Sequence, residues 1–147
     1  MKTFGYVRVS SEEQLKGDGI NRQKRKILAY VKKKNLNLIH TYVDEGLSAY
    51  SGANVSVGQL GSFINGVENG AIDTPCNLIV ENVDRLSRSD IDEAQFNLLR
   101  LTRSGVFIHI LGAAESSERI LKRGMSFADM LMTSIDQDRA NKESAYK

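Results

Sequence analysis

The 147-residue sequence has few of the residues that cross-link small secreted domains or hold metal ions. It contains one cysteine, Cys76, and two histidines, His40 and His109. A single cysteine excludes an internal disulfide and a cysteine-based zinc site, and two histidines do not supply a metal site by themselves. No run approaches the roughly 20 apolar residues of a membrane-spanning helix, and the N-terminus lacks a signal-peptide pattern. We therefore expect an intracellular, cytoplasmic protein that uses no metal or other cofactor and no membrane.

The overall composition is that of one ordinary globular domain, but its charge is unevenly distributed. Hydrophobic residues make up 41% and charged residues 26% of the chain, as is common for proteins that bury a single core. Residues 1–40 hold ten Lys and Arg against three acidic residues, a balance of +7, whereas the whole chain carries +2. Clustered positive charge is typical of a polyanion-binding surface, although a Lys-rich helix face is more often simply solvated.

Apolar runs alternate with helical stripes along the chain. We expect strands over residues 3–9, 37–43, 77–80 and 106–111, helices over 20–35, 57–70, 89–105 and 125–145, and loops over 47–56 and 113–123. Gly70 and Gly105 are the expected stops of two helices. Strands that alternate with helices indicate right-handed βαβ units. The sequence therefore predicts an α/β fold with three αβα layers, a mostly parallel central sheet and a long C-terminal helix.

The first strand ends in a pair of side chains suited to chemistry on an anion. Arg8 and Ser10 lie two residues apart, so in an extended chain they point the same way. A hydroxyl beside a guanidinium suits attack on phosphate, because the guanidinium presents forked donors to phosphate oxygens. The simpler interpretation is a strand that ends in a Ser-Ser turn. In parallel sheets functional residues gather at the carboxyl ends of strands, which places Ser10, Asp44 and Asp84-Arg85 along one edge.

A second group of candidate site residues, all charged, lies at the start of the third predicted helix. Arg85 and Arg88 are three residues apart, and two cations at a helix N-terminus are unfavourable unless an anion is held between them. Asp84 could orient a guanidinium or a nucleophile, and the alternative is a surface Asp-Arg pair of little energetic value. A serine hydrolase needs a histidine base and often a Gly-x-Ser-x-Gly elbow, which are absent. Phosphoryl transfer to serine, with arginines in place of a metal, remains.

Five motifs occur in order along the chain. They are Tyr6-x-Arg8-x-Ser10, Gln14, Gln23, Asp44-x-Gly46-x-Ser48 and Asp84-Arg85-Leu86-Ser87-Arg88. With this order and spacing, the sequence from about residue 2 to the C-terminus resembles the catalytic domain of the serine recombinases, the resolvase/invertase family. Residues 48–54 and 58–61 are most similar to invertase-type members from phages and mobile elements.

The resemblance implies a resolvase-like fold, with residues 1–147 as one catalytic domain and the C-terminal DNA-binding region absent from this chain. It implies that Ser10 attacks a DNA phosphodiester and forms a 5′-phosphoserine, and that strand exchange and rejoining follow without ATP. The implied site is Arg8, Arg85 and Arg88 on the phosphate oxygens, Asp84 as the residue that orients them, and Gln23 beside the phosphate. Arginine does not serve easily as a base, so the group that deprotonates Ser10 is left open.

The implied partners are double-stranded DNA and further copies of the chain, as a homodimer that forms a tetramer in the synaptic complex. Lys24, Arg25 and Lys26 are candidate DNA contacts. The apolar face from Met125 to Ile135 fits either a subunit interface or packing within the chain. One departure from the family is that residues 54–58 lack its usual additional arginine, and no Arg or Lys occurs between Lys34 and Arg85.

Two other functions are compatible with an α/β scaffold of this kind. One is a hydrolase or phosphotransferase. The other is a regulatory or DNA-binding module in which Asp44 accepts a phosphoryl group, which would leave Ser10 and the arginines without a role.

Overall fold

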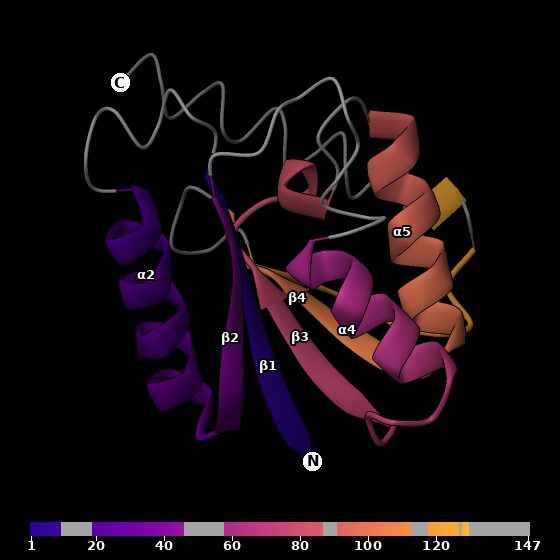
Figure 1. The fold of residues 1–147 in the computed structure, drawn as a ribbon, viewed down its shortest axis with the longest axis horizontal. Coiled ribbons are helices and arrows are strands. Elements are labelled where there is room, and N and C mark those ends of the chain that lie inside the picture. The colour runs from indigo at the N-terminus through magenta and orange to yellow at the C-terminus, as the bar shows by residue number, and fades with distance from the viewer. Residues whose placement is uncertain (10–18, 46–57, 87–90, 113–117, 127, 130–147) are drawn as a thin grey trace.

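The computed structural model describes residues 1–9, 19–45, 58–86, 91–112, 118–126 and 128–129. These residues form one five-stranded sheet of order β2-β1-β3-β4-β5 (Figure 1). The strands are β1 (Lys2–Val9), β2 (Asn37–Glu45), β3 (Cys76–Val80), β4 (Val106–Ile110) and β5 (Arg119–Leu121). β1 pairs in parallel with β2 and β3, and β3 pairs in parallel with β4. Only β5, at one edge, is antiparallel to its neighbour.

Helices cover both faces of the sheet. α2 (Gly19–Lys34) lies on one side, and α4 (Gln59–Glu68) and α5 (Ile91–Arg103) lie on the other (Figure 1). Because side chains alternate along a strand, β1 sends Phe4 and Tyr6 into the core beneath α4 and α5 and Val7 into the core beneath α2. A short 3-10 helix, η1 (Val83–Leu86), follows β3. The predicted three-layer α/β fold with a mostly parallel sheet is therefore confirmed.

From β1 to β4 the predicted order of strands and helices agrees with the structure, and the predicted boundaries lie within two residues of the observed ones. Gly70 and Gly105, the expected helix stops, have φ values of +87° and +98°. Only glycine enters this left-handed region readily, so each ends its helix as expected.

The predicted loop over residues 113–123 is wrong at Arg119–Leu121. These residues form β5, which pairs antiparallel with β4 and buries Leu121 completely. Three residues are too few to show an alternating pattern in the sequence, so the strand exists only through its pairing with β4.

The predicted long C-terminal helix lies largely outside the described residues. Ala128 and Asp129 are helical, and Ser126 Oγ accepts a hydrogen bond of 3.0 Å from the Asp129 N–H. Met125 packs against the core on the α4 and α5 side. Of the apolar face predicted from Met125 to Ile135, Met125 therefore packs within the chain.

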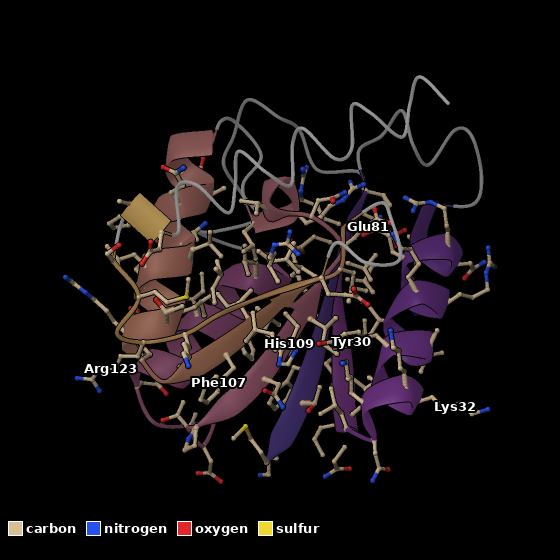
Figure 2. All side chains as sticks on the ribbon, turned by 180° about the vertical axis from the view of Figure 1, so that it is seen from behind. Tyr30, Lys32, Glu81, Phe107, His109 and Arg123 are labelled. Carbon is tan, nitrogen blue, oxygen red and sulfur yellow. The ribbon has the colours of Figure 1, made fainter. Side chains whose placement is uncertain are left out.

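A buried polar chain crosses the sheet and ties α2 to it. The Asn77 amide donates to Thr3 Oγ1 at 3.0 Å, so its oxygen accepts from His109 Nε2 at 2.9 Å. His109 Nδ1 then accepts from the Tyr30 hydroxyl at 2.7 Å, and the two residues lie side by side (Figure 2) with their rings edge to face. Burial lowers the pKa of His109, so the neutral tautomer assigned by this network is stable. His109 therefore has a structural role in β4.

Candidate active site

Three of the predicted site residues meet at the carboxyl end of β1. The main-chain carbonyl of Arg8 accepts a hydrogen bond of 3.0 Å from Arg85 Nη1 and another of 3.0 Å from Gln23 Nε2. These donors come from η1 and α2, which lie 77 and 15 residues away from Arg8 in the sequence. The end of β1, immediately before Ser10, is thus held from both sides.

The local sequence explains why Gln23 and Arg85 reach this point. Gln23, Ile27 and Tyr30 are the buried residues of α2, and their spacing of four and three residues places them on one face of the helix. Gln23 therefore turns toward the sheet with the apolar residues, although it is polar. Arg85 is fixed by η1, whose Val83 and Leu86 side chains are buried in the core.

Glu81 is the anionic centre of this region, directly after β3. It is 3% exposed, and its carboxylate is surrounded by Arg22, Lys26 and Arg85. Glu81 Oε1 lies 3.2 Å from Arg85 Nη2 and 3.1 Å from Arg22 Nη2. Glu81 Oε2 lies 3.1 Å from Lys26 Nζ and also contacts Arg22 Nη1. Figure 2 shows Glu81 at the end of the sheet beside α2.

The charge state of Glu81 follows from these contacts. Burial alone would raise the pKa of the carboxyl, but the hydrogen bonds from Arg22 and the positive charges of Lys26 and Arg22 outweigh it and lower the pKa to about 2. Glu81 is therefore ionised at neutral pH. Three cations therefore share this one buried carboxylate.

The predicted DNA contacts on α2 differ in their surroundings. Lys24 and Arg25 are exposed, whereas Lys26 is partly buried. Lys26 Nζ donates to the carbonyl of Gly112 at 2.8 Å in addition to its ion pair with Glu81. Lys26 therefore joins α2 to the segments that follow β3 and β4, while Lys24 and Arg25 are exposed.

Asp44 anchors the start of α4. Its Oδ1 accepts from the Gln59 N–H at 2.8 Å, and its Oδ2 accepts from the Leu60 N–H at 3.1 Å and from the Tyr6 hydroxyl at 2.7 Å. The N-cap residue of α4, Gly58, makes no side-chain hydrogen bond, so Asp44 caps the helix from β2. Asp44 is 5% exposed and both of its oxygens are engaged. This geometry disfavours the alternative in which Asp44 accepts a phosphoryl group.

Several predicted residues lie outside the described part of the chain. These are Ser10, Gln14, residues 46–57, Ser87 and Arg88. The backbone of Asp84 belongs to η1, and its side chain lies outside the described part of the structure.

Sequence reasoning missed Glu81 and Arg22. Glu81 follows an apolar parallel strand, and functional residues gather at such strand ends, so the same rule could have identified it. Arg22 precedes Gln23 and stands four residues before Lys26, a spacing that puts both cations on one helix face.

Within the described ranges, no three His, Cys, Asp or Glu side chains are grouped as a metal site would require. In the same part of the chain, no helix is both long and apolar enough to cross a bilayer. Cys76 is buried, and burial raises the pKa of its thiol to about 11. Cys76 is therefore no candidate nucleophile.

Comparison with known proteins gives consistent matches. Residues 3–143 match the family model described as the resolvase N-terminal domain. The uncharacterized protein YbcK of Escherichia coli (strain K12) is 38% identical over 108 residues, which are 71% of this chain and 21% of that protein. The chain thus spans about a fifth of the length of this curated relative.

Solved structures share the fold. The N-terminal catalytic domain of TP901-1 integrase aligns with a TM-score of 0.61 and 23% identity, over 99% of this chain and 95% of that one. A resolvase family site-specific recombinase from Streptococcus pneumoniae gives a TM-score of 0.64 and 19% identity, over 99% of this chain and 89% of that one. The C-terminal catalytic domain of ISC1926 TnpA, an IS607-like serine recombinase, aligns with a TM-score of 0.58 and 21% identity, over 78% of this chain and 72% of that one.

Proposed function

Because the chain belongs to the resolvase N-terminal domain family, the catalytic domain of the serine recombinases, we propose that it cuts and rejoins DNA in site-specific recombination with Ser10 as the nucleophile. The observation that carries the proposal is the convergence on the Arg8 carbonyl. Arg85 and Gln23 belong to separate motifs, and both bind the backbone two residues before Ser10. A backbone held in this way can present a nucleophile in a defined direction.

In the proposed step, Ser10 Oγ attacks the phosphorus of a DNA phosphodiester. The Oγ–P bond forms as the bond from phosphorus to the 3′ oxygen breaks, and the leaving oxygen takes up a proton to become a 3′ hydroxyl. The serine keeps the 5′ phosphate, so the energy of the broken bond is retained. Attack by a 3′ hydroxyl of another strand reverses the step and joins the exchanged ends.

The arginines supply the electrostatic part of the reaction. We assign Arg8, Arg85 and Arg88 to the non-bridging phosphate oxygens, Asp84 to orienting this group, and Gln23 to positioning the phosphate. Guanidinium groups fixed before the reaction stabilise the charge that develops in the transition state. The three cations gathered at Glu81 support an anionic substrate at this end of the sheet.

The partners are part of the same proposal. The substrate is double-stranded DNA, contacted by Lys24, Arg25 and Lys26 on α2, and the protein acts in the cytoplasm as a homodimer that forms a tetramer when two sites meet. The region that reads the DNA sequence is proposed to lie outside residues 1–147. Membership of the invertase-type subgroup also stays a prediction.

A covalent adduct tests the proposal. The full-length protein is incubated with supercoiled plasmid that carries the genomic DNA around its own gene, and the reaction is stopped with denaturant. We expect protein attached to 5′ ends, no adduct from Ser10→Ala, and a normal adduct from the neighbouring Ser11→Ala. An adduct from Ser10→Ala would show that another residue is the nucleophile, and nicked DNA without attached protein would favour a hydrolase.

A further inference from the structure

We propose that Glu81 is a positioning residue for DNA cleavage, whose buried carboxylate holds the guanidinium of Arg85 in its working orientation. The inference rests on the proposed function. It adds a residue that lies outside the motifs of the family resemblance and that no earlier step of the mechanism uses.

The contacts of Arg85 define the orientation. One terminal nitrogen, Nη1, donates to the Arg8 carbonyl at 3.0 Å, and the other, Nη2, donates to Glu81 Oε1 at 3.2 Å. A planar guanidinium bound at both terminal nitrogens cannot rotate without breaking a hydrogen bond. The Arg8 carbonyl and the Glu81 carboxylate therefore set the plane of the group together.

The contacts of Glu81 explain how the carboxylate can serve as a fixed point. Arg22 binds both of its oxygens, and Lys26 adds an ion pair of 3.1 Å. These two cations come from α2, while Arg85 comes from η1. Glu81 is thus clamped by one element and presented to a residue of another, which removes the freedom that a surface carboxylate would have.

Charge and burial together exclude a direct role for Glu81 on the substrate. Its side chain is 4% exposed, and its negative charge would repel a phosphate. Removing that charge should strengthen the attraction of the region for DNA. It should also remove the charge that Arg22, Lys26 and Arg85 share, so that the contact that orients Arg85 is weakened. Binding and cleavage are therefore expected to change in opposite directions.

The experiment compares Glu81→Gln, Glu81→Asp and a control, Glu68→Gln, in the full-length protein. Glu68 pairs with Arg100 through a 3.1 Å contact between α4 and α5, so the control removes a carboxylate from an ion pair remote from Glu81. Adduct formation is timed at saturating concentrations of the plasmid described above. Affinity is measured on a duplex oligonucleotide of arbitrary sequence, and far-ultraviolet circular dichroism checks that each variant is folded.

We expect Glu81→Gln to lower the rate at saturating DNA by about 100-fold, the scale of a misplaced reacting group, with an equal or tighter Kd. Glu81→Asp keeps the charge and should recover part of the rate, and Glu68→Gln should match the parent protein. The inference is overturned if Glu81→Gln has the same adduct rate at saturating DNA as the parent protein. It is also overturned if Glu81→Gln loses rate and DNA affinity equally, or if the Gln and Asp variants have the same adduct rate. Absence of any adduct from the parent protein instead overturns the proposed function and this role of Glu81 with it.

Discussion

Glu81 is a buried carboxylate that stays ionised because cations from two elements surround it. Its pKa of about 2 lies below the ordinary value of 4.5, since the hydrogen bonds and charges from α2 outweigh the effect of burial. A carboxyl with a depressed pKa stabilises the folded state above its unfolded pKa, and this contribution is lost as pH falls toward the folded pKa. The ion cluster of Glu81 with Arg22, Lys26 and Arg85 is therefore expected to weaken as pH falls from about 4.5 to about 2.

The first prediction follows from this titration. The free energy of unfolding of the parent protein should fall by about 3 kcal/mol more than that of Glu81→Gln as pH drops from 7 to 2. Urea unfolding followed by circular dichroism at several pH values measures the difference. Glu68→Gln is the control, because Glu68 is more exposed and contributes less. Parallel curves for the parent and Glu81→Gln would show that the ion cluster does not contribute.

At the scale of elements, α4 begins with a helix end that its own N-cap residue does not satisfy. Gly58 supplies no side-chain hydrogen bond, and Asp44 of β2 accepts from the first N–H groups of the helix instead. The negative charge of Asp44 also faces the positive end of the helix macrodipole. A residue of β2 thereby determines where α4 starts.

The second prediction concerns this cap. Asp44→Asn places an amide nitrogen against a hydrogen-bond donor and removes the charge, so the free energy of unfolding should fall by about 1–3 kcal/mol. Tyr6→Phe is the matched variant, because it removes the hydroxyl that donates to Asp44 and should cost about 1 kcal/mol. Chemical denaturation measures both changes. An Asp44→Asn protein as stable as the parent would contradict the capping role.

α2 carries exposed cations near one end and a lysine cluster at the other. Lys24 and Arg25 are exposed and lie close to the buried Gln23 in the first half of the helix, whereas Lys32, Lys33 and Lys34 form its last turn. The helix N-terminus lies at the same edge of the sheet as the carboxyl ends of the strands (Figure 1). Only the first group is therefore near the candidate site.

The third prediction separates the two groups of cations. Each phosphate contact contributes about 0.9 to the slope of log affinity against log salt concentration. Replacing both Lys24 and Arg25 with Gln should reduce the slope by up to about 2, whereas replacing Lys32 and Lys34 should change it little. Titration of labelled duplex DNA at several salt concentrations gives the slopes. Equal slopes for the parent and the Lys24/Arg25 variant would exclude these residues as DNA contacts.

At the scale of the whole molecule, the proposed chemistry requires more than one copy of the chain. Each chain carries one Ser10 and can hold one 5′ phosphate, whereas a duplex has two strands to cut. The proposed reaction therefore needs two chains at each site, and four when two sites exchange strands.

The fourth prediction is the assembly that this count implies. Light scattering on the full-length protein should give the mass of a dimer on a single-site DNA fragment. Arresting the plasmid reaction with denaturant should give adducts on both strands of each cut. Adducts confined to one strand of every cut would contradict the paired arrangement.

The sequence by itself determined the order of strands and helices from β1 to β4 and the residue types of the candidate site motifs. Periodicity acts over neighbouring residues, so the strand that leads to Arg8, the buried face of α2 and the glycine stops at Gly70 and Gly105 could all be predicted.

Only the tertiary structure decided which distant residues meet. β5 exists because β4 pairs with it, Asp44 caps α4 from another strand, and Glu81 binds Arg22 across 59 residues of sequence. Such contacts depend on how elements pack, and no local pattern records packing between elements. The motifs therefore identified the arginine at position 85, but only the fold showed which carboxylate holds it.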